Sequence, residues 1–91
     1  MGYGGEGSLY RGEPAVHNGA DDNASGVAVL LDLANKIRGT KLSKNYLFIT
    51  FSGEEMGLLG SNFFTKNPTL DLGGVSYMLN LDMVGRLRED K

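Results

Sequence analysis

Three short acidic stretches contain the residues of this chain that could do chemistry. They read Gly19-Ala20-Asp21-Asp22-Asn23-Ala24-Ser25-Gly26, Ser52-Gly53-Glu54-Glu55 and Asn80-Leu81-Asp82-Met83-Val84-Gly85, and each lies where a predicted helix or strand begins or ends. Carboxylates gathered in one place repel one another, so a cluster of them needs a cation or a shared proton. The pattern therefore predicts a carboxylate-rich site for a divalent metal.

A helix is predicted directly after the first acidic stretch, over residues 24–38. Its apolar residues recur at the spacing of one helical face, with polar residues between them. They are Val27, Leu30, Leu31, Ala34 and Ile37. Asp22, Asn23 and Ser25 are candidate caps at the start, and Gly39 suits the end.

The other two acidic stretches follow predicted strands. Residues 46–51 form a continuous apolar run, which predicts a central parallel strand covered on both faces, and residues 75–81 predict a second strand. A short helical pattern over residues 58–64 lies between them and stops at Asn67-Pro68. The order helix, strand, helix, strand predicts a right-handed βαβ unit in an α/β fold, a three-layer fragment of a mostly parallel sheet.

This topology would place the acidic residues at one rim of the sheet. Ligands of open α/β sheets bind outside the carboxyl ends of the strands, where Glu54, Glu55 and Asp82 would lie, facing the helix start that carries Asp22. We expect a single domain over residues 1–91, with a loop over 1–18 and an α/β core over 19–91.

The overall composition excludes several classes of protein. The chain has 91 residues and a net charge of −2 with scattered Lys and Arg, which argues against nucleic-acid binding. It has no cysteine, so disulfides and Cys-ligated zinc are excluded. Its apolar runs are far shorter than the about 20 residues that cross a bilayer, and we see no signal peptide. The composition leaves the localisation open.

The three acidic stretches, in this order, resemble the motifs of the di-zinc exopeptidases that include the bacterial leucyl aminopeptidases, the peptidase M28-like family. The resemblance covers nearly the whole chain. It implies that Asp22 bridges two zinc ions, that Glu55 binds one zinc and Asp82 the other, and that Glu54 is the general base acting on a peptide substrate. It also implies a cis peptide bond between Asp22 and Asn23.

The chain departs from the family pattern in its histidines. The family uses two as ligands, whereas this chain has only His17, which matches neither and is interpreted as a solvent-exposed loop residue. Each zinc would keep two of three protein ligands. We therefore expect a core fragment of a longer peptidase that binds zinc weakly and hydrolyses little or nothing. An all-oxygen remnant would also suit Mg²⁺, Ca²⁺ or Mn²⁺.

Alternative functions remain open at this point. A glutaminyl-cyclase-like or carboxypeptidase-like enzyme of the same fold would carry the same motifs, and a non-catalytic metal-binding or interaction module could have lost the histidines. Retention of Glu54 argues against such a module. Asp21 is interpreted as a cap or a support for the site, and Ser25 as a cap. A partial core would also expose apolar surface, so we expect self-association.

Overall fold

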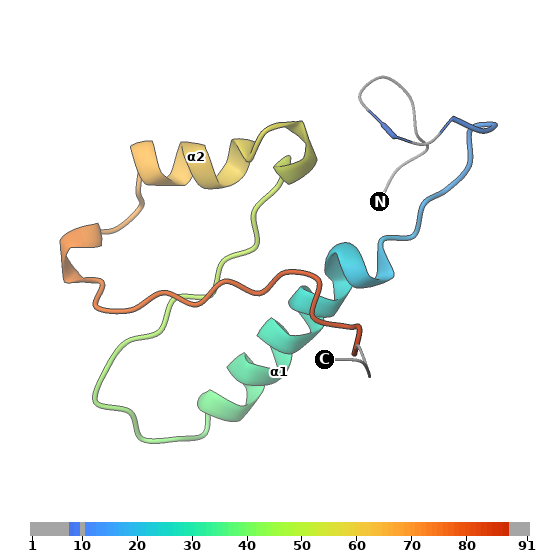
Figure 1. Cartoon of the computed structure of the whole chain (residues 1–91). Coiled ribbons are helices and arrows are strands. Elements are labelled where there is room, and N and C mark those ends of the chain that lie inside the picture. Colours follow the sequence, from blue (N-terminus) through green and yellow to red (C-terminus); the bar gives the residue numbers. More distant parts are fainter. Residues whose placement is uncertain (1–7, 10, 88–91) are drawn as a thin grey trace. The chain divides into compact units, whose positions relative to one another are not determined.

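The computed structural model describes residues 8, 9 and 11–87 (Figure 1). Its helical elements are the turn η1 (Ala20–Ser25), helix α1 (Gly26–Ile37), the 3-10 turn η2 (Glu54–Met56), helix α2 (Leu59–Lys66) and the 3-10 turn η3 (Leu72–Gly74). The chain divides into two compact units, the first from Met1–Thr40 and Leu81–Lys91 and the second from Lys41–Asn80. A single domain over residues 1–91 stays a prediction.

Helix α1 confirms the helix predicted over residues 24–38, with ends that differ by two residues or fewer. Its half-buried side chains follow an i, i+3, i+4, i+7 pattern. They are Leu30, Leu33, Ala34 and Ile37. Val27 and Leu31, which the sequence places on the same face, are 39% and 65% exposed.

An exposed ion pair lies on α1. Lys36 Nζ is 2.9 Å from Asp32 Oδ2, one helical turn earlier. The hydrogen bond from Lys36 to Asp32, together with the attraction between their charges, raises the pKa of Lys36 above its usual 10.5. An acidic residue four positions before a basic one is the more favourable orientation for such a pair on a helix.

Helix α2 follows a tight turn in the second unit and confirms the helical pattern predicted over residues 58–64. The rings of Phe51 and Phe64 pack in a tilted arrangement with centroids 5.8 Å apart, so the segment before the turn contacts the helix after it. The helix ends at Lys66, and the N–H of Asn67 still donates to the carbonyl of Phe63 at 2.8 Å. No helix among the described residues has the length and apolar content needed to cross a membrane.

The two predicted strands are wrong. Residues 46–51 and 75–81 carry no strand, and the described part of the chain contains no β-strand at all (Figure 1). A strand requires ladder hydrogen bonds to a neighbouring strand. No backbone hydrogen bond joins residues 46–51 to residues 75–80 in the described part. These residues therefore do not form the expected three-layer α/β sheet. The regular structure in the described part of the chain is helical.

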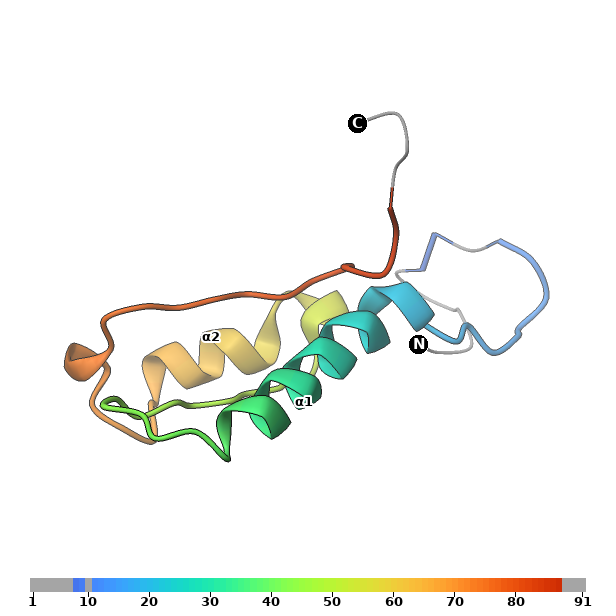
Figure 2. The same cartoon turned by 90° about the horizontal axis from the view of Figure 1, so that it is seen from below.

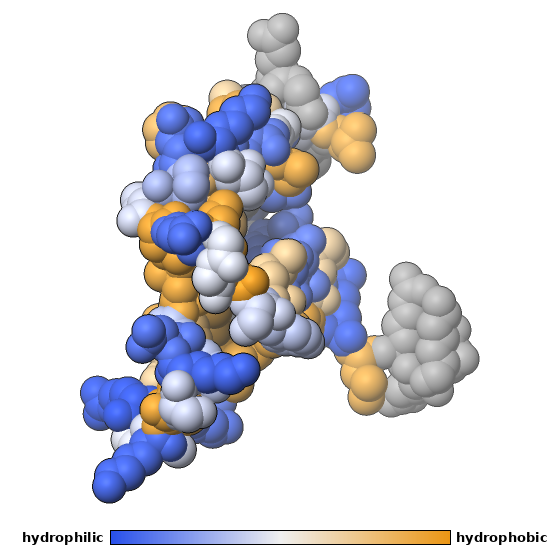
Figure 3. Space-filling model, turned by 90° about the vertical axis from the view of Figure 1, so that its left-hand side faces the viewer, coloured by the Kyte–Doolittle hydropathy of each residue, from blue (hydrophilic) through white to orange (hydrophobic). Residues whose placement is uncertain are grey.

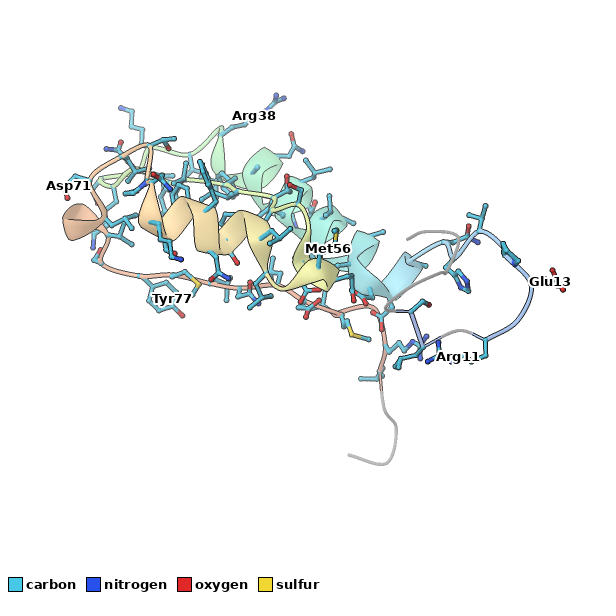
Figure 4. The ribbon with its side chains drawn as sticks, turned by 90° about the horizontal axis from the view of Figure 1, so that it is seen from above. Arg11, Glu13, Arg38, Met56, Asp71 and Tyr77 are labelled. Carbon is cyan, nitrogen blue, oxygen red and sulfur yellow. The ribbon has the colours of Figure 1, made fainter. Side chains whose placement is uncertain are left out.

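Apolar side chains remain largely accessible to solvent. Of the described residues only Gly26 is buried, and no large hydrophobic side chain is. Leu47 and Phe51 are 56% and 45% exposed, which contradicts the expectation of a strand covered on both faces. Figure 3 shows hydrophobic side chains at the visible surface, and in Figure 4 the side chain of Tyr77 projects away from the ribbon. These side chains contribute little hydrophobic stabilisation, because they stay in contact with water.

Candidate metal centre

The first acidic stretch and the third are joined by hydrogen bonds within the first unit. Polar side chains at alternate positions of η1 reach the backbone of residues 81–85, about sixty positions later in the chain. They are Asp21, Asn23 and Ser25. Figures 1 and 2 both show the segment after residue 80, in red, passing beside the start of α1. We call this set of contacts the η1 clamp.

Asn23 makes the central contacts of the η1 clamp. Its Nδ2 donates to the carbonyl oxygen of Leu81 at 3.0 Å, and its Oδ1 accepts from the backbone N–H of Met83, also at 3.0 Å. The same Oδ1 accepts from the N–H of Gly26, the first residue of α1, at 3.2 Å. Asn23 therefore binds the residues on both sides of Asp82 and also caps the helix.

Ser25 and Asp21 complete the η1 clamp at the two residues that follow Met83, which are Val84 and Gly85. The Ser25 hydroxyl accepts from the N–H of Val84 at 3.1 Å and donates to the carbonyl of Asp21 at 2.6 Å. Asp21 Oδ1 accepts from the N–H of Gly85 at 2.8 Å, and Asp21 Oδ2 is 3.2 Å from Arg86 Nε. Side chains of η1 thus accept hydrogen bonds from three successive backbone N–H groups, at 83, 84 and 85, all of them in exposed residues.

These contacts refine the roles predicted for two residues. Ser25 occupies the position before α1 but makes no capping bond with its side chain, so its interpretation as a cap is wrong. Asn23 makes that bond to Gly26 in its place. Asp21, whose side chain is only 12% exposed, supports the residues that follow Asp82, which agrees with the supporting role expected for it.

Two glycines allow the close approach of these segments. A Cβ at Gly26 would lie 2.6 Å from the Leu81 carbonyl oxygen and 2.6 Å from Asn23 Oδ1. A Cβ at Gly85 would lie 3.0 Å from both Asp21 Oδ1 and the Cβ of Ser25. The alternation of polar residues in η1 followed by Gly26 was the available signal for the clamp.

The backbone around Asp22 is irregular. The peptide bond between Asp22 and Asn23 is cis, which confirms the expectation drawn from the resemblance. Asp22 and Asn23 have non-helical backbone angles inside η1, with φ of −107° and −134°. Asp22 is exposed, as is Asp82. Because the clamp holds both neighbours of Asp82 against the residue that follows Asp22, the two aspartates belong to one contact region.

The second acidic stretch lies in a tight turn of the second unit. Gly53 and Gly57 have positive φ angles of 68° and 103°, which only glycine adopts without strain, and Leu58 also has a positive φ of 57°. The N–H of Leu59 donates to the carbonyl of Gly53 at 3.1 Å, and the N–H of Gly60 to that of Ser52 at 2.9 Å. These bonds close the turn against the start of α2.

Glu54 and Glu55 are the first two residues of η2, inside this turn, and both are exposed. A 3-10 helix has three residues per turn, so its successive side chains point in directions about 120° apart. This geometry lets adjacent carboxylates take different tasks.

The four candidate residues fall into two pairs. Asp22 and Asp82 belong to the first unit and Glu54 and Glu55 to the second, so a meeting of all four stays a prediction. Within the described part of the chain, no group of three or more His, Cys, Asp or Glu side chains comes together to hold a metal ion. Carboxylates are suitable donors for divalent cations, and two of them supply part of a coordination shell. His17 is half-buried, which corrects its interpretation as solvent-exposed.

Comparisons with known proteins give a consistent assignment. The profile of peptidase family M28 matches residues 6–91. A probable zinc metalloprotease of Pyrenophora tritici-repentis is 43% identical over 75 residues, 79% of this chain and 17% of that protein. The aminopeptidase YwaD of Bacillus subtilis is 40% identical over 68 residues, 74% of this chain and 15% of that protein.

A third relative is leupeptin-inactivating enzyme 1 of Streptomyces exfoliatus, which is 36% identical over 70 residues, 74% of this chain and 16% of that enzyme. This chain thus spans about one sixth of the length of these relatives. No solved structure gives a significant match.

Proposed function

This chain belongs to peptidase family M28, and we propose that it supplies metal-binding residues and the general base of a zinc-dependent exopeptidase of the aminopeptidase type. The observation that carries the proposal is the η1 clamp, which holds the residues around Asp82 against the turn that contains Asp22. A structural loop could be closed by any local contact. A clamp that holds together two exposed aspartates from distant parts of the chain fits a cation site.

Each carboxylate has a distinct role in this proposal. Asp22 would be shared by two zinc ions, with Asp82 holding one of them and Glu55 the other. Zinc, when bound, would polarise the scissile carbonyl of a peptide and make a nearby water more acidic. Glu54 takes the proton of the attacking water and passes it to the leaving amine, which a free carboxylate next to a ligand can do.

The 91-residue chain is expected to bind zinc weakly and to turn over little or no substrate. Asp22 with Asp82, and Asp22 with Glu55, give two protein ligands for each ion, whereas zinc in catalytic sites usually has three. Peptides are the proposed substrates of the complete enzyme.

Zinc affinity of the chain, measured by competition with a chelating dye, tests this assignment. Glu54→Gln and Glu55→Gln form a matched pair, because they make the same change at adjacent residues of one turn. Glu55→Gln should weaken zinc binding, since it removes a ligand, whereas Glu54→Gln should leave the affinity within about twofold. Equal effects of the two changes would contradict the division of roles.

The aspartates extend the same measurement. Asp22→Asn should reduce binding at both zinc positions and Asp82→Asn at one, while Asp32→Asn, the same change at an exposed position of α1, should have no effect. If the Asp22 and Asp82 variants bind zinc as tightly as the parent chain does, the assignment of these residues as zinc ligands is wrong. Release of nitroaniline from an aminoacyl-nitroanilide by the chain with added zinc would overturn only the expectation of low turnover.

We also propose that the chain self-associates through its exposed apolar side chains. Tyr77, Met78 and Leu79 are 81%, 76% and 62% exposed in succession, a row of apolar surface that favours contact with another molecule. Sedimentation velocity should show species larger than a monomer, with a fraction that grows with concentration. A monomer at all concentrations would contradict this part of the proposal.

A further inference from the structure

We propose that Asn23 is a positioning residue of the metal site, whose side-chain amide fixes the Asp82 backbone beside Asp22. The inference rests on the proposed function, since it assigns a task toward the zinc that Asp22 and Asp82 would share. Nothing in the motif itself requires this task, because the sequence predicts Asn23 only as a candidate cap. The contacts of its side chain carry the inference.

Asn23 holds Asp82 from both sides. Its Nδ2 donates to the carbonyl of Leu81 at 3.0 Å and its Oδ1 accepts from the N–H of Met83 at 3.0 Å. One planar group therefore fixes both peptide units that flank Asp82. The amide suits this task, because its Nδ2 donates one bond while its Oδ1, on the same rigid plane, accepts the other.

The same side chain is tied to Asp22 by the covalent backbone and to α1 by a third bond. Asn23 directly follows Asp22, and its Oδ1 also accepts from the N–H of Gly26 at 3.2 Å. Asn23 is half-buried, and a Cβ at Gly26 would have no room beside it. The amide is thus held at the helix start and cannot rotate away without losing three hydrogen bonds.

The other clamp residues do not bracket Asp82. Ser25 contacts the N–H of Val84, and Asp21 contacts the N–H of Gly85 and the side chain of Arg86. They hold the same segment, but at residues 84–86, which follow Asp82 in the chain. This difference separates a positioning role from general support of the segment.

Metal ligands depend on the groups that orient them, and loss of such a partner typically lowers metal affinity about 10- to 100-fold. We expect Asn23→Ala to weaken zinc binding to the 91-residue chain within that range. Asn23→Ser is the second variant, because its hydroxyl can still cap α1 but cannot reach both sides of Asp82. It should weaken binding to a similar extent while α1 keeps its far-UV circular dichroism.

Two control variants accompany these changes. Ser25→Ala loosens the same segment without touching the bracket and should change zinc affinity less than about threefold. Asn67→Ala removes an amide that donates to the carbonyl of Phe63 at the end of α2, and should leave affinity unchanged. The visible absorption of bound Co²⁺ gives a readout of ligand geometry, and it should change in the Asn23 variants but not in Ser25→Ala.

The outcomes separate this inference from the function on which it rests. If Asp82→Asn weakens zinc binding and the Asn23 variants bind like the parent chain, the positioning role is overturned and the proposed site stands. Equal losses in the Asn23 variants and Ser25→Ala, with the same Co²⁺ spectrum, would show general loosening and also overturn it. If Asp82→Asn itself has no effect, the proposed function fails and the inference falls with it.

Discussion

Replacing Gly26 by Ala is the sharpest perturbation of the η1 clamp. Gly26 is the one buried position among the described residues, and its missing Cβ would lie 2.6 Å from the Leu81 carbonyl oxygen. Ordinary contacts of a Cβ begin at 3.4 Å, so the segment would have to move by about 0.8 Å. The Leu81 oxygen belongs to the backbone and cannot rotate aside, so Asp82 must move with it.

The size of the effect follows from two opposing terms. Forcing an extra methyl into a packed contact costs about 1–3 kcal/mol, and the strained Asn23 bonds add to this loss. Alanine is a better helix former than glycine by about 1 kcal/mol in a helix interior, but Gly26 is the first residue of α1, where the gain is smaller. We expect a net loss of about 1–3 kcal/mol in the local stability of the clamp.

Amide hydrogen exchange measures this loss at the contact itself. The N–H of Met83 donates to Asn23 Oδ1, so its exchange reports opening of the clamp. Exchange should become about 5- to 150-fold faster in Gly26→Ala, the factor that 1–3 kcal/mol represents. Gly39→Ala is the control, because a Cβ there meets nothing within 4 Å. Unchanged protection of Met83 in Gly26→Ala would refute the close-packing argument.

Two further predictions concern other contacts. Gly60→Ala would place a Cβ 2.6 Å from the Ser52 carbonyl oxygen, so the N–H of Leu59, which closes the same turn, should exchange faster. Gly74→Ala is the control, because a Cβ there meets nothing within 4 Å, and it should leave the exchange of Leu59 unchanged. Equal exchange rates of Leu59 in the two variants would contradict the packing of this turn. The raised pKa of Lys36 means that its pairing stabilises α1 fully below pH 10.5 and is lost as the pH rises through the higher pKa of the folded state. Helicity measured by circular dichroism should therefore fall less above pH 10.5 in Asp32→Asn than in the parent chain, and identical curves would count against the pair.

The candidate site was predictable to different extents in its different parts. Motif order named Asp22, Glu54, Glu55 and Asp82, and it also implied the cis bond that the structure contains. The partners of Asn23 were not predictable, because they lie 58 and 60 positions away and the alternating polar residues of η1 do not say what they bind. A capping residue and a clamp residue look alike in sequence, since both present a short polar side chain.

The sequence by itself determined the two helices and the turns at their ends. Helix hydrogen bonds run between residues four positions apart, so the apolar period of residues 27–37 and the stop at Asn67-Pro68 were enough to locate α1 and α2. Only the tertiary structure decided which face of α1 is covered, whether the apolar runs pair as strands, and which distant backbone groups the side chains of η1 bind. Each of these depends on partners supplied by another part of the chain, and a ladder or a clamp exists only where such partners come within hydrogen-bonding distance.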